Sequence, residues 1–187
     1  LAELADLYSS VTILDLPSNL GPSAARDLGI RKLTTDFVTQ LDGDDMFWPT
    51  KNASEAEAIA GDAKVVAFSD VLLVSPDQSD VRSTAAYGKK TGNEVFQTLL
   101  SRISQIPRDM TMSRQLYFEV GGYNMTMNLY EDWEFKLRLA VKSARWVRSE
   151  SIAGTVYNRM TPGLSGVDDS LHARALAQIF LRSLAFD

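Results

Sequence analysis

The sequence of 187 residues predicts an α/β fold, with a mostly parallel central sheet and helices on its faces. Three observations lead to this prediction. Apolar runs rich in β-branched residues alternate with helix-like stretches over the first half of the chain, and their spacing suits crossover connections between parallel strands. Hydrophobic residues make up 45% of the chain and charged residues 23%, which supplies enough apolar material for a sizeable core.

In the first half of the chain the expected elements alternate between strand and helix. Residues 10–16 (SVTILDL) are β-branched and apolar, and they predict a strand. Residues 23–33 predict a helix that begins with a serine N-cap. Residues 36–41 (DFVTQL) predict the next strand, and residues 52–61 predict a short helix that stops at its final glycine. The run at 64–74 (KVVAFSDVLLV) predicts a buried strand or a pair of strands.

Helices dominate the expected second half. Residues 80–92 are polar and irregular, and they predict a loop. Residues 93–104 predict a helix, and residues 131–144 predict another, in which apolar side chains recur at helical spacing. The tail at 170–186 predicts an amphipathic helix that packs against the domain or a partner. The lone histidine, His172, is expected on the surface of this helix.

Charge and composition exclude several classes of function. The formal net charge of −5 argues against a nucleic-acid-binding surface, which needs a basic stripe. The absence of cysteine excludes disulfides and thiolate metal sites. No apolar run approaches the roughly 20 residues of a membrane span.

Three carboxylates, Asp42, Asp44 and Asp45, follow the strand expected at 36–41. In open α/β sheets, ligands bind at the carboxyl ends of the strands. Carboxylates this close together resist ionisation unless a cation joins them, and a hard divalent cation prefers oxygen ligands. The spacing does not fit a calcium-binding hand. One interpretation is a divalent-metal site that bridges to a diphosphate, and the other is a solvated acidic turn.

Four stretches resemble the family 2 glycosyltransferases, which have the GT-A fold. In chain order they are NLGPSAARDLGI, DFVTQLDGDDMFWP, VVAFSDVLLV, and GGYN followed by EDWEFKLRLA. Each motif alone is weak, but their order and separations make the set specific. The resemblance covers roughly residues 11–165. It implies a GT-A domain at 1–165, in which the family's first strand and its base-contacting aspartate are missing, and a C-terminal helix at 166–187.

The resemblance assigns roles around the acidic cluster. Asp44 matches the metal-binding position of the family's Asp-x-Asp motif. Asp42 matches the position that contacts the ribose or supports the metal through water, and Asp45 orients the loop. Arg26 matches an arginine near the nucleotide, where a planar guanidinium suits base edges or phosphate oxygens, although an ordinary surface ion pair is the alternative. The implied cofactor is Mn²⁺ or Mg²⁺, which acts as a Lewis acid on the diphosphate.

A second group of matches lies at or before the helix expected at 131–144. Asp132 matches the general base that takes the proton from the acceptor hydroxyl, and the first turn of a helix favours its ionised form. Glu131 could assist Asp132 or could itself be the base. The alternative for both is that they are ordinary acidic residues in the first turn of a helix. Gly121 and Gly122 either let the backbone approach the sugar or form a plain turn.

Other positions depart from the family pattern or carry weaker assignments. Asp27 stands where the family has asparagine, and Met160 and Thr161 stand where many members have a motif with a histidine. Arg159 could reach the diphosphate, whereas Trp133 is expected in the core. The Gln-x-x-Arg-Trp motif of processive synthases is not matched, which favours the addition of a single sugar.

The resemblance and the residues together predict an inverting, metal-dependent, non-processive glycosyltransferase. It would move a sugar from a nucleotide-diphosphate sugar, with a UDP-sugar favoured, to a hydroxyl of a carbohydrate, lipid-linked or protein acceptor. The implied setting is cell-envelope polysaccharide synthesis in the cytoplasm or at the cytoplasmic face of the membrane. A homodimer is an option. Two alternatives stay open: a nucleotidyltransferase of similar architecture, and a non-catalytic nucleotide-sugar-binding module.

Overall fold

The computed structural model describes residues 8–75, 81–84, 93–101, 106–127, 129–142, 145–151, 154–158 and 168–183. The helices in these ranges are α2 (Gly21–Lys32), α3 (Lys51–Ile59), α4 (Asn93–Leu100), α5 (Arg114–Glu119), α6 (Glu131–Lys142) and α7 (Asp169–Ser183). The strands are β1 (Phe37–Val38), β2 (Met46–Phe47), β3 (Val65–Phe68), β4 (Val71–Val74), β5 (Val81–Thr84), β6 (Thr111–Ser113), β7 (Arg145–Arg148) and β8 (Thr155–Asn158).

The described strands form two four-stranded sheets, with the orders β1-β6-β3-β7 and β2-β8-β4-β5. The β3–β7 and β4–β8 pairs are parallel, and the other pairings are antiparallel. The α/β class is therefore confirmed, and in the β1-β6-β3-β7 sheet three strands, β1, β3 and β7, run in the expected common direction, while β6 runs against them. Alternation along the sequence predicts the types of the elements and not their directions. After β4, β5 and α4 the chain returns as β6, which runs antiparallel between β1 and β3.

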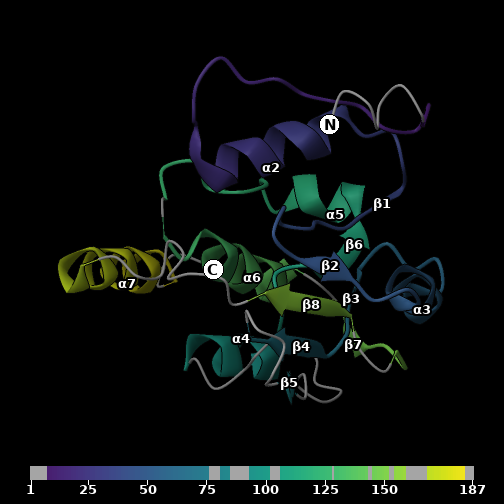
Figure 1. Ribbon diagram of the computed structural model, residues 1–187. Helices are drawn as coiled ribbons and strands as arrows, with labels where there is room; N and C mark the ends of the chain where they lie inside the picture. The colour runs from purple at the N-terminus through teal and green to yellow at the C-terminus, as the bar shows by residue number, and fades with distance from the viewer. Residues whose placement is uncertain are drawn as a thin grey trace.

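Helices cover both faces of the β1-β6-β3-β7 sheet (Figure 1). Successive residues of a strand point to opposite faces, and β3 shows the consequence. Val66 and Phe68 join the main core with side chains of α4, α5 and α6, while Val65 and Ala67 pack with Ile59 of α3. Because both faces are buried, the strand is continuously apolar in sequence.

The strand expected at 10–16 is not formed. Residues 8–20, here called the N-terminal strap, contain no helix or strand and pass beside α2 (Figure 1). Val11 and Ile13 are 40% and 44% exposed. A strand needs a neighbour for its backbone groups, and none of the described strands pairs with the strap. The prediction rested on side-chain type, which carries no information about the partner.

Helix α2 begins two residues earlier than expected, so the predicted serine N-cap is wrong. Pro22 occupies its first turn, and the backbone N–H of Gly21 donates to Oδ1 of Asn19 at 2.9 Å. Ser23 lies inside the helix, where its buried hydroxyl donates to the carbonyl of Met127 at 3.2 Å. This hydrogen bond attaches α2 to the loop that precedes α6.

The second half of the chain follows the expected helices and adds strands. β5 lies within the stretch expected to be a loop and pairs with β4, while residues 85–92 of that stretch lie outside the described residues. Helix α7 confirms the expected packing against the domain, because its Ile179 is fully buried in the main core. His172 is half-buried, and its Nδ1 shares a hydrogen bond of 2.8 Å with the hydroxyl of Tyr130. Within the described part of the chain, no helix has both the length and the apolar character to cross a membrane.

Candidate active site

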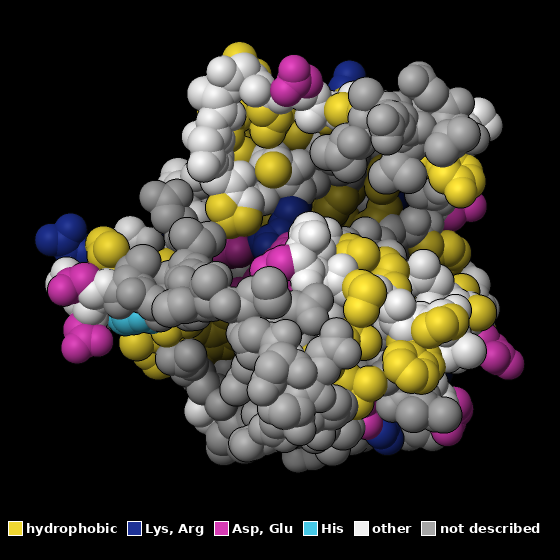
Figure 2. Space-filling view, viewed as in Figure 1, with side chains coloured by type: hydrophobic (Ala, Val, Ile, Leu, Met, Phe, Trp, Pro, Cys, Tyr) yellow, Lys and Arg dark blue, Asp and Glu magenta, His cyan; other side chains and the backbone are white. Residues whose placement is uncertain are grey.

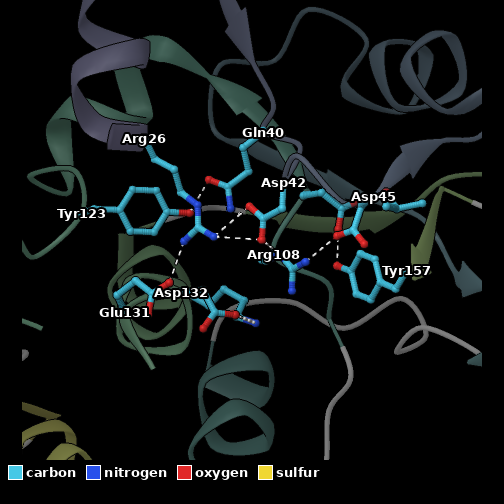
Figure 3. Close-up of polar contacts among 12 residues, drawn as sticks. Arg26, Gln40, Asp42, Asp45, Arg108, Tyr123, Glu131, Asp132 and Tyr157 are labelled. Carbon is cyan, nitrogen blue, oxygen red and sulfur yellow. Dashed lines mark hydrogen bonds and ion pairs between the residues drawn. The ribbon is translucent and has the colours of Figure 1, made fainter. Parts of the chain in front are cut away.

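The motifs predicted from the two halves of the chain meet at one place. On the face shown in Figure 2, acidic and basic side chains lie together in a hollow. Figure 3 shows the elements that supply them: Arg26 reaches in from α2, residues 42–45 (here called the acidic loop) follow β1, and Glu131 and Asp132 stand at the start of α6. Beside them, a cavity of about 800 Å³ lies between the strap, α2 and residues 39–44.

Arg26 links the acidic loop to the start of α6. Its Nη2 donates to both carboxylate oxygens of Asp42, at 2.9 and 3.1 Å, and its Nη1 donates to Oε1 of Glu131 at 2.6 Å. The arginine side chain is 14% exposed. Burial alone would lower the pKa of Arg26, but the hydrogen bond and negative charge of Asp42 outweigh it and raise the pKa. The three side chains therefore act as one ion-paired unit.

The acidic loop has the donor atoms of a hard-cation site. One carboxylate oxygen from each of Asp42, Asp44 and Asp45 can be chosen so that all lie within 4.8 Å of one another. The backbone N–H of Asp45 donates to the carbonyl of Asp42 at 3.1 Å, which closes the turn. Asp44 is exposed, and Asp45 is buried. An all-oxygen set on a solvent-accessible turn fits Mn²⁺ or Mg²⁺, because such ions take one or two carboxylates and complete their shell with water or phosphate.

Arg108, which no motif of the sequence singled out, lies at the centre of the cluster (Figure 3). Its Nε lies 2.8 Å from Oδ2 of Asp42, and its Nη2 lies 2.5 Å from Oδ2 of Asp45. The guanidinium also stacks over the ring of Tyr157, 4.5 Å from its centroid. Burial would lower the pKa of Arg108, but Tyr157, Asp42 and Asp45 together raise it.

Asp132 is held in its charged form by its neighbours. The ammonium group of Lys136, one turn along α6, lies 3.0 Å from its Oδ2 and also donates to the carbonyl of Ile106 at 3.0 Å. Burial would raise the pKa of Asp132, but Lys136, followed by Arg108 and Arg26, holds the pKa below its usual value. Its side chain is 28% exposed, so a substrate can still reach this ionised carboxylate.

The Gly121–Gly122 turn has a clear internal cause. Both glycines adopt positive φ, +88° and +67°. A Cβ at Gly122 would lie 2.6 Å from Oδ1 of Asp27, a buried carboxylate that accepts hydrogen bonds from Tyr117 and Arg31. Only glycine fits this close approach.

The same turn delivers Tyr123 into the site. The hydroxyl of Tyr123 donates to Oε1 of Gln40 at 2.6 Å, and its ring lies 5.7 Å from the guanidinium carbon of Arg26. Among the described residues, Nε2 of Gln40 is buried and has no hydrogen-bond partner. Tyr123 and Gln40 therefore form the wall behind Arg26, between α2 and β1.

A buried carboxylate supports the other side of the site. Asp109 accepts hydrogen bonds from the hydroxyls of Thr155 and Tyr157, the latter at 2.5 Å, and its carbonyl accepts one from Thr39 at 2.9 Å. These contacts tie the segment that carries Arg108 to β8 and to the end of β1. The signal in the sequence was slight: a charged pair after a proline, just before a short strand.

Most of the predicted site residues converge. Arg26, Asp42 and Glu131 are in direct contact, and Asp44 and Asp132 belong to the same cluster. Gly121 and Gly122 lie in the turn behind it, as just described. Trp133 is buried and donates to the carbonyl of Leu99, as expected for a core residue. Arg159 lies outside the described residues.

Comparisons with known proteins identify a family and several relatives of this chain. The model of the family described as "Glycosyl transferase family 2" matches residues 1–125. The chain is 24% identical over 147 residues to an uncharacterised glycosyltransferase, YwdF, of Bacillus subtilis, and 29% identical over 162 residues to the pre-mycofactocin glycosyltransferase of Mycobacterium tuberculosis. These alignments cover 70% and 82% of this chain but 48% and 33% of the relatives, so the chain spans half of their length or less.

The fold is also found in a solved glycosyltransferase. The structure of residues 1–349 of TarS from S. aureus in complex with UDP-GlcNAc superposes with a TM-score of 0.72 at 13% sequence identity, covering 96% of this chain and 54% of that one. The complex with UDP gives 0.65 at 15% identity. At such identities the likeness establishes the shared GT-A fold. Because the family model extends over about two thirds of the sequence, the chain belongs to glycosyl transferase family 2.

Proposed function

We propose that this domain is an inverting glycosyltransferase that uses a nucleotide-diphosphate sugar, a divalent cation and an acceptor hydroxyl, and adds one sugar at a time. The observation that carries the proposal is the ion-paired unit of Arg26, Asp42 and Glu131. It joins residues that are 105 positions apart in the sequence and sets the acidic loop beside the carboxylates of α6. A donor held at the loop would therefore lie next to a base.

The charge of the cluster supports the need for a divalent cation. The described site contains six carboxylates and three cationic side chains, an excess of three negative charges when all are ionised: Asp42, Asp44, Asp45, Asp109, Glu131 and Asp132 against Arg26, Arg108 and Lys136. Such a surface repels a diphosphate. Asp44 and Asp42 would hold the cation, which would offset this charge and act as a Lewis acid on the diphosphate.

Asp132 would act as the general base. Because Lys136 contacts Oδ2, the acceptor hydroxyl would donate its proton to the other carboxylate oxygen as its own oxygen attacks the anomeric carbon. Glu131, which is paired with Arg26, would position the donor and the acceptor. One direct displacement inverts the anomeric configuration and requires no covalent intermediate on the enzyme.

The remaining assignments follow from the site and the relatives. Gly121 and Gly122 would border the transferred sugar through the turn that carries Tyr123. A UDP-sugar is the favoured donor, because TarS, which shares the fold, was crystallised with UDP and with UDP-GlcNAc. The family match favours glycosyl transfer over the nucleotidyltransferase alternative. The acceptor would be a carbohydrate, a lipid-linked group or a protein, as in cell-envelope polysaccharide synthesis.

The test is a thermal-shift screen of nucleotide sugars with and without MnCl₂, followed by an assay for the released nucleoside diphosphate. A ligand that binds the folded state raises the apparent melting temperature, so one class of nucleotide sugar should raise it only when the metal is present. Release of the nucleoside diphosphate from the same donor would then show turnover. The proposal fails if no nucleotide sugar shifts the melting temperature under either condition.

A further inference from the structure

The three cationic side chains of the site differ in their exposure and in how many of their N–H groups take part in ion pairs. Arg26 is tied to Asp42 and Glu131 and is 14% exposed. Lys136 is tied to Asp132 and to the carbonyl of Ile106 and is 9% exposed. Arg108 is the most exposed of the three, at 29%, and it reaches its two carboxylates through Nε and Nη2, so Nη1 lies outside both ion pairs.

We propose that Arg108 is a donor-binding residue that contacts the diphosphate of the nucleotide sugar. This inference rests on the proposed function and adds to it a residue that no motif of the sequence indicated. A guanidinium offers a planar set of N–H donors that matches phosphate oxygens, which a single ammonium group does not. Figure 3 shows Arg108 at the acidic loop, on the far side of Asp42 from Arg26.

Cation binding would make Arg108 available for this contact. Asp42 belongs to the triad that fits a divalent cation, and its Oδ2 is also the partner of Arg108 Nε. A cation at Asp42 and Asp44 would weaken the attraction between that carboxylate and the arginine. The diphosphate that arrives with the cation would offer Arg108 a negative charge in place of the Asp42 carboxylate. Arg108 would then exchange one carboxylate for a phosphate oxygen without crossing the site.

The support behind Arg108 suits an exchange of this kind. The ring of Tyr157 lies under the guanidinium at 4.5 Å, and the tyrosine hydroxyl is fixed by the buried Asp109. Stacking restrains the plane of the guanidinium and leaves its N–H edge facing the loop. A lysine at this position would keep the charge but would lose both the stacking on Tyr157 and the planar set of N–H donors.

The experiment measures binding by isothermal titration calorimetry, with UDP or inorganic pyrophosphate as the probe in the presence of MnCl₂, and with MnCl₂ alone. In Arg108→Ala, the affinity for UDP with Mn²⁺ should fall about 10- to 100-fold, as expected for a lost hydrogen bond to a charged group. The affinity for pyrophosphate should fall by a similar factor. The affinity for Mn²⁺ alone should rise, because a competing cation has been removed from Asp42 and Asp45.

Arg148→Ala is the matched control, since Arg148 also pairs through Nε and Nη2 with a buried carboxylate, that of Asp70, which lies between β3 and β4 and outside the acidic loop. It should leave all three affinities unchanged. Arg108→Lys should lose part of the UDP affinity while it keeps the charge, and it serves as the test variant if the alanine variant does not fold by circular dichroism.

The outcomes separate the two proposals. If the unmodified protein shows no metal-dependent binding of UDP or pyrophosphate, the proposed function fails, and this inference fails with it. If the unmodified protein binds but Arg108→Ala binds UDP equally well or more tightly, Arg108 is only a counter-ion of the acidic loop and the inference is overturned. A loss for UDP without a loss for pyrophosphate also overturns it, since the contact would then lie on the nucleoside.

Discussion

The three carboxylates of the acidic loop differ in how accessible they are to a ligand. Asp42 is engaged by Arg26 and Arg108, and Asp45 is buried against Arg108. Asp44 is the exposed member of the three, at the point of the turn where a cation and a diphosphate can enter together. Asp44, which is proposed as the main metal ligand, is therefore also the most accessible of the three to a cation.

Asp44→Ala is expected to abolish Mn²⁺-dependent binding of a nucleoside diphosphate and to leave the fold intact. The reason is that an exposed carboxylate can bind a ligand but is not packed in the hydrophobic core. Isothermal titration calorimetry with UDP and MnCl₂ measures the affinity, and thermal melting checks the fold. Glu57→Ala, an exposed carboxylate on α3, is the control. An unchanged metal-dependent affinity in Asp44→Ala would remove this residue from the site.

Asp132→Asn tests whether Asp132, and not its neighbour Glu131, is the proposed general base. The amide keeps the size of the side chain but cannot accept the proton, so turnover should fall roughly 10²- to 10⁴-fold. Donor and metal affinity should barely change, since the defect lies in the chemical step. Glu131→Gln should lower turnover by a smaller factor than Asp132→Asn does. Steady-state rates with an acceptor, or donor hydrolysis as a weaker substitute, measure the difference. If Asp132→Asn turns over normally while Glu131→Gln is inactive, the two roles are exchanged.

The pH dependence of turnover should respond to Lys136. Lys136 is the main group that lowers the pKa of Asp132, so this carboxylate, the proposed base, stays ionised to a more acidic pH in the unmodified protein. Lys136→Met removes that charge while the burial remains, so the pKa of Asp132 should rise and the acidic limb of the rate profile should move to higher pH. Rates of donor hydrolysis from about pH 4 to pH 8 check this, because the range spans the ordinary carboxylate pKa and neutrality. Lys142→Met, at the exposed end of α6, should leave the limb in place.

At the scale of the element, α3 is attached to the sheet by a buried ion pair. Lys51 and Glu55 are both fully buried, with Nζ 2.8 Å from Oε2. Glu55 also accepts from the hydroxyls of Ser69 at 2.6 Å and Thr111 at 2.5 Å, and Lys51 donates to Thr39 at 3.2 Å. Through these contacts α3 fixes the strand segment that leads into the acidic loop.

Lys51→Met should lower the free energy of unfolding by about 3–5 kcal/mol, because it leaves the carboxylate of Glu55 buried without its cation. The double variant Lys51→Met/Glu55→Met should recover much of this loss. Urea denaturation followed by circular dichroism measures both. Lys64→Met, which removes a surface ion pair with Glu119, should leave the midpoint close to that of the unmodified protein. A single variant as stable as the parent would show that the pair does not hold α3 in place.

At the scale of the whole molecule, the β1 edge of its sheet is unpaired among the described strands, as are the edges at β7, β2 and β5. β1 pairs with β6 on one side only. Toward its other side lie the cavity of about 800 Å³ and the strap, with exposed apolar side chains at Leu14 and Leu41. Unpaired strand edges next to apolar surface attract further strands.

The 187-residue chain, produced alone, is therefore expected to self-associate in a concentration-dependent way. Sedimentation velocity over a range of concentrations measures this. Leu41→Lys should shift the distribution toward monomer, because a charge on an edge opposes pairing, whereas Met125→Lys, an exposed residue of the loop after Tyr123, should not. A monodisperse monomer that unfolds in one cooperative transition would contradict the expectation.

The sequence by itself determined the α/β class, the order of the described helices except α5, and most of the candidate site. Residues such as Asp44, Asp132 and Arg26 could be chosen because they match motif positions of the glycosyltransferase family that the sequence resembles, and such motifs are visible along one chain. The buried side of α6, including Trp133, was predictable from the helical spacing of its apolar residues. Periodicity also located α3 and α7 to within a few residues.

The tertiary structure alone decided strand direction, pairing and the partners of each charge. The strap at 8–20 has the composition of a strand but pairs with none of the described strands, and pairing depends on a neighbour that side-chain type does not specify. Arg108 reached the site because β6 returns beside β1 and brings the preceding segment against the acidic loop. Position 122 must be glycine because a Cβ there would collide with the carboxylate of Asp27, which lies 95 positions earlier in the chain. Contacts between distant segments depend on how the chain returns on itself, which no local pattern records.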